Sequence, residues 1–98
     1  MDVEFEDASL DRLETDSGFS AGFGGAIVKA YRRRMQQIRA ASDERTFYAL
    51  RSLHFEKLTR DREGQYSIRL NKQWTLIVEL RGEAPRKTVR VIEITDYH

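Results

Sequence analysis

Two histidines stand beside other side chains that can take part in acid–base chemistry. His54 is followed three residues later by Lys57, and His98 comes directly after Tyr97. Histidine titrates near neutral pH, so it can act as a general base or as a general acid. Lysine can stabilise charge on a phosphate, and tyrosine can stack on an unpaired base. These residue types predict metal-free cleavage of RNA, provided that the two segments converge in the fold.

The reaction itself defines what the site must contain. One group removes the proton of the 2′-hydroxyl, and another protonates the departing 5′-oxygen. Cations must stabilise the extra negative charge on the phosphorus, and one arginine can bind two phosphate oxygens at once. Arg69 is the candidate for this task. For each histidine taken alone, the alternative is a purely structural role.

Patterns typical of other chemistries are either absent from the sequence or lack the structural context that they require. There is no cysteine and no His-Glu-x-x-His motif, and a histidine at the chain end would be a poorly braced metal ligand. The run Gly18-Phe19-Ser20-Ala21-Gly22 has the Gly-x-Ser-x-Gly spacing but follows no expected strand, as a nucleophile motif would, and the glycines at 22–25 lack the strand and spacing of a phosphate-binding loop. We therefore expect no metal site and no cofactor.

Charge is distributed unevenly along the chain. Residues 1–16 hold seven acidic residues and one basic residue, a net charge of −6, whereas residues 17–98 hold sixteen basic and nine acidic residues, a net charge of +7. The basic part indicates an anionic partner, although a solvated surface of mixed charge is the alternative. The same two interpretations apply to the polar residues of the helix expected below: Lys29, Arg32, Arg33, Gln36, Gln37 and Arg39.

Length and composition predict one globular domain over residues 1–98. The chain is 40% hydrophobic and 34% charged, which is an ordinary balance for such a domain. The acidic N-terminus lacks the apolar region of a signal peptide, and no apolar run approaches the roughly 20 residues of a membrane span. We expect a cytoplasmic protein without a membrane partner.

The N-terminal half predicts one short strand followed by helices. Val3–Phe5 is the strand candidate, and residues 9–14 could form one or two helical turns. Ser20 is a candidate N-cap for a longer helix, because apolar residues recur at helical spacing over residues 23–38. A further short helix is expected over residues 42–50, with Ser42 as its cap.

The C-terminal half predicts a meander of three antiparallel strands. Residues 51–65 are interpreted as a polar, irregular connection. Residues 65–70 and 74–80 then alternate between apolar and polar side chains, and residues 88–95 are rich in valine and isoleucine. A turn over residues 71–73 predicts the pairs Leu70 with Trp74, Ile68 with Leu76 and Tyr66 with Val78.

This register also predicts that Arg69 lies directly across from Thr75 on the other face of the sheet. The expected fold class is α+β: an N-terminal strand, two helices, and a twisted antiparallel three-stranded meander with the helices packed on one face. Such packing leaves the other face, or a rim of the sheet, available for function.

The order of several motifs resembles the HigB branch of the RelE/ParE toxin superfamily. The segments are Leu53-His54-x-x-Lys57-Leu58, the run from Gly64 to Asn71, Gln73-Trp74, and the closing Asp96-Tyr97-His98. The resemblance covers most of the chain and is most specific over residues 53–98. The combination of the upstream His-x-x-Lys with the final Asp-Tyr-His is the strongest part of it.

The resemblance implies a RelE-like domain that acts as the toxin of a type II toxin–antitoxin system. Such a toxin is an mRNA interferase, a ribosome-binding hydrolase that cleaves messenger RNA in the ribosomal A site. A HigA-type antitoxin silences it, and the toxin contacts DNA only indirectly, through that antitoxin. The implied active-site residues are His54, Lys57, Asp96, Tyr97 and His98, with Arg69 as a basic position on the adjacent strand.

One position departs from the pattern of these toxins. They usually carry an arginine after the aromatic residue that begins the next strand, and this arginine binds the scissile phosphate, but here the dipeptide is Trp74-Thr75. Threonine is neutral and too short for that contact. Loss of one such donor typically lowers the rate by about 10²–10³. We therefore expect that activity is reduced or abolished by Thr75, whether the change is natural or engineered, unless another arginine compensates.

Two other interpretations remain open at this stage. A ParE-like inhibitor of DNA gyrase would share the fold but typically lacks the His-x-x-Lys and Tyr-His residues. A non-catalytic member of the superfamily that only binds an antitoxin is the alternative that Thr75 favours.

Overall fold

The structure is a computed structural model that describes residues 1–83 and 86–96. The elements follow the order expected for an α+β protein, with helices first and most of the strands later. They are β1 (Asp2–Phe5), α1 (Ala8–Thr15), α2 (Gly25–Ala40), α3 (Arg45–Ala49), η1 (Arg51–Leu53), β2 (Glu56–Lys57), η2 (Arg60–Arg62), β3 (Gln65–Arg69), β4 (Thr75–Arg81) and β5 (Thr88–Thr95).

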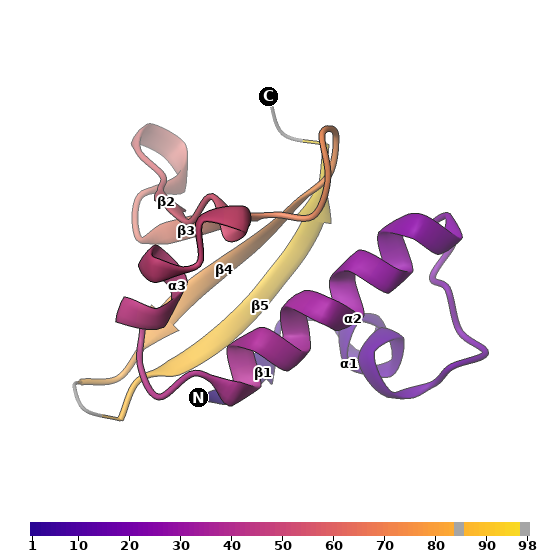
Figure 1. The fold of residues 1–98 in the computed structure, drawn as a ribbon, viewed down its shortest axis with the longest axis horizontal. Helices are drawn as coiled ribbons and strands as arrows, with labels where there is room; N and C mark the ends of the chain where they lie inside the picture. The colour runs from indigo at the N-terminus through magenta and orange to yellow at the C-terminus, as the bar shows by residue number, and fades with distance from the viewer. Residues whose placement is uncertain (84–85, 97–98) are drawn as a thin grey trace.

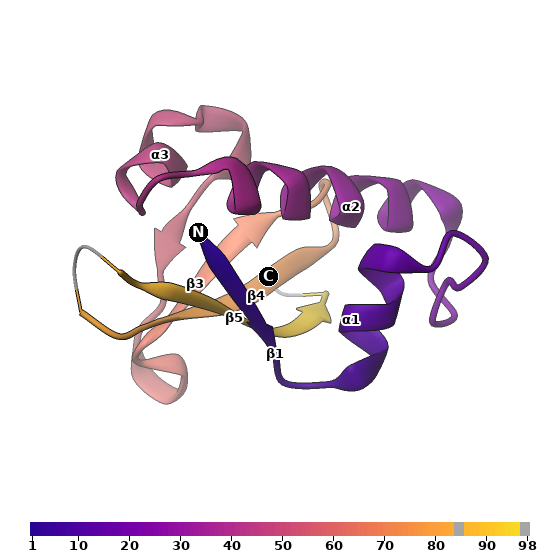
Figure 2. The same ribbon diagram turned by 90° about the horizontal axis from the view of Figure 1, so that it is seen from below.

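The strands form a five-stranded sheet with the order β1-β5-β4-β3-β2. The pairs β2–β3, β3–β4 and β4–β5 are antiparallel, so the predicted meander is present, and β1 pairs in parallel with β5. Figures 1 and 2 show α2 running across one side of this twisted sheet, with α1 beside its N-terminal half. We call that side the helix face and the opposite side the open face.

The register of the β3–β4 hairpin is the predicted one. Ile68 pairs with Leu76 and Arg69 with Thr75, and Tyr66 pairs with Val78. Alternation with a period of two therefore places Ile68, Leu76 and Val78 on the helix face. The open face carries mostly polar side chains, with the exception of Ile77, which pairs with Ser67 and is fully buried.

A bulge in β5 keeps its apolar residues on the same side. Val78 pairs with Val91, whereas Ile77 pairs with Glu93. Ile92 is therefore an extra residue that has no partner in β4. An extra residue of this kind restores the alternation after an odd spacing. Because of it, Ile94 as well as Val91 packs against the helix-face core.

The core is built between the sheet and the apolar side of α2. Tyr31, Met35 and Ile38 recur at helical spacing and are almost completely buried. They belong to one cluster with the helix-face residues of the strands, including Leu76 and Val89. Full burial of side chains of this size stabilises the fold by about 1.5–3 kcal/mol each, so α2 is fixed firmly on the sheet.

Several polar groups of α2 bind α1 and the loop that follows it. The hydroxyl of Tyr31 donates a 2.7 Å hydrogen bond to the carbonyl of Leu10. Arg39 binds both carboxylate oxygens of Glu14, at 2.7 and 2.8 Å. Arg32 donates to carbonyls at the end of α1 and in the loop that follows. Part of the basic surface expected on this helix therefore serves contacts within the chain.

The prediction that this helix begins after Ser20 is wrong, because α2 begins at Gly25 and Gly24 is its N-cap. Ala21 and Gly22 have positive φ angles of 52° and 82°, and such left-handed backbone cannot continue into a right-handed helix. Ser42 is likewise not the cap of α3, which begins at Arg45.

The sequence predicts an irregular connection over residues 51–65, but these residues contain regular secondary structure. They contain η1, the short strand β2 and η2, and β2 extends the sheet beyond β3. Leu53, Phe55 and Leu58 are buried and fasten the segment to the body of the protein. The sequence of this segment resembles a polar loop because the residues between these three apolar side chains are charged or polar.

Within the described ranges, no helix has the length and apolar character that crossing a membrane would require.

The Tyr31 contact predicts how stability depends on pH. Burial, followed by the charges of Glu14 and Asp11, raises the pKa of the Tyr31 phenol above its usual value. The protonated Tyr31 phenol therefore makes its full contribution to the free energy of unfolding below about pH 10. This contribution is lost at higher pH, because the phenol of the unfolded chain ionises first. Tyr31→Phe should cost about 1 kcal/mol in urea unfolding at pH 7, and the difference from wild type should shrink above pH 10. A difference that stays constant between pH 7 and pH 11 would contradict this.

Candidate functional site

Three strands end together at one edge of the sheet, which we call the rim. Arg69 closes β3, Thr75 opens β4, and Thr95 closes β5. Arg69 pairs with Thr75, and Thr75 pairs with Thr95, so the three side chains share the open face. Arg69 is exposed, and its guanidinium makes no hydrogen bond or ion pair within residues 1–83 and 86–96.

The turn between β3 and β4 fixes the rim. The side-chain oxygen of Asn71 accepts hydrogen bonds from the backbone nitrogens of Gln73 (2.8 Å) and Trp74 (2.7 Å). Asparagine favours such turns because its side chain can bind the backbone just ahead of it. Gln73 in turn donates a 3.1 Å hydrogen bond to the carboxylate of Asp96, directly after β5. Asp96 is thus held beside the turn, while the predicted residues Tyr97 and His98 lie outside the described residues.

His54 is exposed between two buried anchors. Leu53 and Phe55 are both in the core, at 0% and 8% exposure. His54 itself has φ 46° and ψ 49°, in the left-handed region, and its backbone nitrogen donates to the carbonyl of Arg51. Histidine is among the residues that tolerate this conformation best. The left-handed backbone at His54 ends η1, and its imidazole lies at the surface.

Arg34 of α2 connects the His54 segment to the rim. Its Nε donates a 2.9 Å hydrogen bond to the carbonyl of Arg69, and its Nη2 donates at 3.2 Å to the carbonyl of Ser52. Burial, with a smaller effect from Arg33, lowers the pKa of Arg34 below its usual value. One guanidinium thus places the segment before His54 next to the end of β3. Arg34 could not be predicted as a site residue from its sequence context, because hydrogen bonds to backbone carbonyls leave no motif.

The structure does not bring Lys57 onto the same face as Arg69. Lys57 pairs with Tyr66 and therefore points to the helix-face side of the sheet edge, where it is exposed. Its neighbour Glu56 pairs with Ser67 and shares the open face with Arg69. Of the predicted site residues that are described, Arg69, Thr75 and Asp96 lie at the rim. His54 lies near the rim, because Arg34 binds both the segment before His54 and the end of β3. Lys57 lies at the sheet edge and points to the other side of the sheet.

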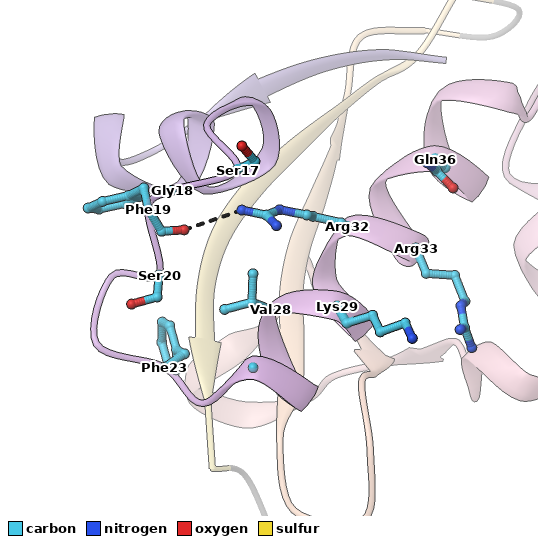
Figure 3. Close-up of a pocket in the computed structure, with 11 residues that line it drawn as sticks. Ser17, Gly18, Phe19, Ser20, Phe23, Val28, Lys29, Arg32, Arg33 and Gln36 are labelled. Atoms are coloured by element: carbon cyan, nitrogen blue, oxygen red, sulfur yellow. Dashed lines mark hydrogen bonds between the residues drawn. The ribbon is translucent and has the colours of Figure 1, made fainter.

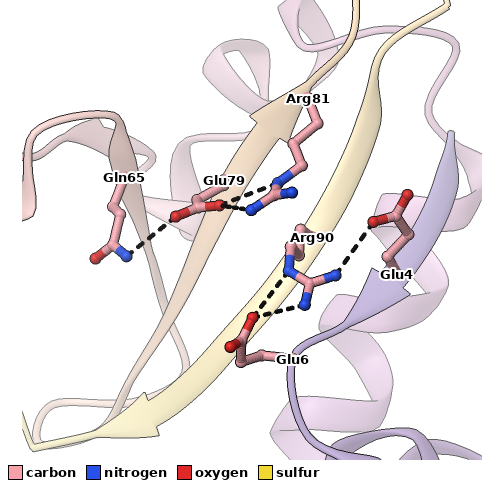
Figure 4. A network of polar contacts seen from close by, with 6 residues as sticks. All are labelled: Glu4, Glu6, Gln65, Glu79, Arg81 and Arg90. Carbon is pink, nitrogen blue, oxygen red and sulfur yellow. Dashed lines mark hydrogen bonds and ion pairs between the residues drawn. The ribbon is translucent and has the colours of Figure 1, made fainter.

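The middle of the open face is charged but locally neutral. Arg90 binds Glu4 and Glu6, at 3.2 and 2.6 Å, and Glu79 accepts hydrogen bonds from Arg81 and Gln65 (Figure 4). The Glu6 carboxylate raises the pKa of Arg90, in agreement with a close pair. An additional pair joins Arg62 to Glu93 at 2.9 Å. Among the described residues, Arg69 at the rim and Arg51 beside His54 are bound to no carboxylate, in contrast to the arginines of this region.

Two surface hollows flank these elements. We call the first the His54 hollow, with a volume of about 310 Å³; it is lined by Phe47, Tyr48, Leu50, Arg51, His54, Phe55 and Glu56. The second, the α2 hollow, has a volume of about 580 Å³ and lies between α2 and the loop that precedes it (Figure 3).

The wall of the α2 hollow is held by Arg32. It donates hydrogen bonds to the carbonyls of Leu13 (3.0 Å), Asp16 (2.9 Å) and Phe19 (3.3 Å), the last of which is drawn in Figure 3. Lys29 and Arg33 also line the hollow, are exposed, and form no ion pair with the described part of the chain. None of the described residues that line this hollow is acidic. It is therefore a basic depression with partly apolar walls.

No group of three or more His, Cys, Asp or Glu side chains that could hold a metal ion occurs in the described ranges. The described groups that could carry chemistry are the guanidinium of Arg69 and the carboxylate of Asp96 at the rim and the imidazole of His54 near it. These can move protons and stabilise anionic charge.

Solved structures share this fold. A YoeB/ParE toxin from Agrobacterium tumefaciens matches with a TM-score of 0.61 and 16% identity, and the match covers 100% of both chains. A chain of a YoeB–YefM complex from Staphylococcus aureus matches with a TM-score of 0.61 and 15% identity, over 100% of this chain and 97% of that one. At such identities the likeness concerns the fold. A search of curated proteins finds no match.

A family model gives a more specific result. The model described as the RelE-like toxin of the type II toxin–antitoxin system HigB matches residues 3–98, nearly the whole sequence. The predicted fold class and the resemblance noted from the motifs are both confirmed. The chain belongs to the HigB-like family of RelE-like toxins of type II toxin–antitoxin systems.

Proposed function

We propose that this toxin is a ribosome-dependent endoribonuclease that cleaves messenger RNA in the A site by metal-free general acid–base chemistry. The observation that carries the proposal is the pair of hydrogen bonds from Arg34 to the carbonyls of Ser52 and Arg69. These bonds hold the His54 segment beside the rim, where β5 leads into Asp96. They support the inference that groups distant in the sequence act together on one phosphodiester.

The proposed roles follow from the chemistry of the groups. One imidazole removes the 2′-hydroxyl proton, so that this oxygen attacks the phosphorus, and the other donates a proton to the departing 5′-oxygen. His54 and His98 are assigned these tasks. Asp96 is assigned to orient the C-terminal segment, and Tyr97 is assigned to stack on a base or to bind the phosphate.

Positive charge at the rim is assigned to Arg69. Its guanidinium is exposed and has no carboxylate partner among the described residues, so it is available to a phosphate. Lys57, at the edge of the sheet, is assigned a contact with a neighbouring phosphate rather than the scissile one, because it points away from the face that carries Arg69. These two assignments place phosphate binding at the rim and at the sheet edge, which agrees with the neutral charge of the middle of the open face.

The proposed partners are the ribosome with its messenger RNA, and a HigA-type antitoxin. The matched structure from Staphylococcus aureus is titled a YoeB–YefM complex, which supports a protein partner for this toxin. We place an acidic segment of the antitoxin in the α2 hollow, where Lys29 and Arg33 offer unpaired charge beside Phe19 and Phe23. Contact with DNA would be made through the antitoxin, and the single domain of residues 1–98 would act in the cytoplasm.

A second function is favoured by one observation. Thr75 lies directly across from Arg69, at the position where an arginine is usual in these toxins. A toxin that lacks this donor could still bind its antitoxin without cutting RNA. The first two tests below separate this non-catalytic function from an endonuclease.

The first test removes the proposed acid–base groups. His54→Asn retains a residue that tolerates the left-handed backbone but cannot titrate, and it should lower mRNA cleavage on translating ribosomes by about 10²–10⁴. A chain ending at Thr95 should lose cleavage to a similar degree. Both variants should bind the antitoxin as wild type does, in a pull-down with equal input. Undiminished cleavage by both would refute the assigned roles.

The second test restores the missing cation. Thr75→Arg places a guanidinium on the open face beside Arg69 and should increase the cleavage rate by about 10²–10³ on the same ribosomes. Thr75→Gln is the control, since it adds length and polarity without charge. Equal rates for wild type and Thr75→Arg, both well above background, would show that position 75 does not limit the reaction.

The third test concerns the antitoxin surface. Replacing both Lys29 and Arg33 by Glu should weaken the toxin–antitoxin complex by about tenfold or more, and the loss should diminish at high salt because the contact is electrostatic. Arg45→Glu is the matched control, as Arg45 is an exposed arginine on α3 outside the α2 hollow. If the double variant and the control bind equally in isothermal titration, the antitoxin sits elsewhere.

A further inference from the structure

Tyr48 stands apart from the other large apolar side chains of the described chain. It is 57% exposed, whereas the others are buried or partly buried. It lies on α3 and lines the His54 hollow. An aromatic ring left in solvent beside a proposed catalytic imidazole is unexplained by packing alone.

The ring of Tyr48 is held in place by a series of aromatic contacts. It meets Phe55 edge to face, with centroids 4.8 Å apart and planes at 83°. Phe55 is itself stacked on Tyr66, at 4.9 Å and 2°, and contacts Phe47 at 5.3 Å. Because Phe55 is buried, Tyr48 rests on a fixed support and still exposes more than half of its surface. A rigid, exposed aromatic ring is a suitable surface for stacking.

The other residues around the hollow offer polar groups of both kinds. Arg51 can donate hydrogen bonds, Glu56 can accept them, and His54 can do either. The guanidinium of Arg51 makes no hydrogen bond or ion pair with residues that the structure describes. The volume of about 310 Å³ is at the lower end of the range for small-molecule pockets, roughly 300–1,000 Å³, and suits one flat ring system.

We propose that the His54 hollow binds the base of one nucleotide, stacked on Tyr48, with its ribose directed toward His54. The inference rests on the proposed function, and it names a binding residue that the motifs do not include. It orders the substrate along the surface: the base lies in the hollow, the 2′-hydroxyl at His54, and the phosphate toward Arg69. Arg34 sets the spacing of the last two, since it binds the backbone on both sides.

The test compares two probes that differ only by a base. Adenosine 5′-monophosphate and ribose 5-phosphate are titrated into the full chain, and the shifts of backbone amide signals around residues 48–56 are followed by NMR. Base stacking should make the nucleotide bind about 5–100 times more tightly than the sugar phosphate. In Tyr48→Ala this ratio should fall to about one, whereas Tyr48→Phe should retain it. Arg45→Ala, on the same helix, is the control for a general change in α3.

A second readout separates this inference from the proposed function. On translating ribosomes, Tyr48→Ala should raise KM for mRNA cleavage more than it lowers kcat, and Tyr48→Phe should restore KM. A base-dependent ratio that vanishes in Tyr48→Ala supports the subsite even if wild type cuts no RNA, in which case the proposed function fails alone. A ratio unchanged in Tyr48→Ala overturns the subsite even if wild type cleaves well. Loss of antitoxin binding with an unchanged ratio would assign Tyr48 to a protein contact instead.

Discussion

The burial of one side of α2 against the sheet is the interaction on which the remainder of the structure depends. Tyr31, Met35 and Ile38 fix the helix, and the residues between them then project in set directions. Arg32 reaches the end of α1, whereas Arg34 reaches the backbone of η1 and β3. A single helix thus anchors the first helix, the His54 segment and the rim. The buried apolar side of α2 stabilises its packing on the sheet. Its arginines fix the positions of the backbone segments that they bind.

The distribution of charge separates a structural region from a region available to ligands. On the open face, Arg90 and Arg62 are bound to carboxylates. These partly exposed pairs contribute little to stability, typically below about 1 kcal/mol each, but they cancel charge locally. Arg69 and Arg51 make no ion pair within the described ranges, and both lie near His54 or the rim. A polyanion would therefore be drawn to the edge of the sheet rather than to its centre.

Much of the fold could be predicted because it depends on period and composition. Alternation in β3 and β4 was sufficient to fix their register, down to the pairing of Arg69 with Thr75. The start of α2 could not be predicted, since the left-handed backbone at Ala21 has no sequence signal of its own. The motifs named His54 and the rim residues, but not Arg34, whose acceptors are carbonyl oxygens that every residue carries. The direction of the Lys57 side chain depends on β2, and a strand of two residues is too short to show a pattern in the sequence.

The parallel pairing of β1 with β5 has a consequence for the order of folding. It joins residues 2–5 to residues 88–91, so the first strand has no partner until nearly the whole described chain has been synthesised. Contacts between such distant segments form slowly, because a long loop must close first. β5 also supplies the third strand of the rim. A nascent chain therefore lacks both its closed sheet and its rim until β5 has been synthesised, so the finished surface appears late in the folding of this domain.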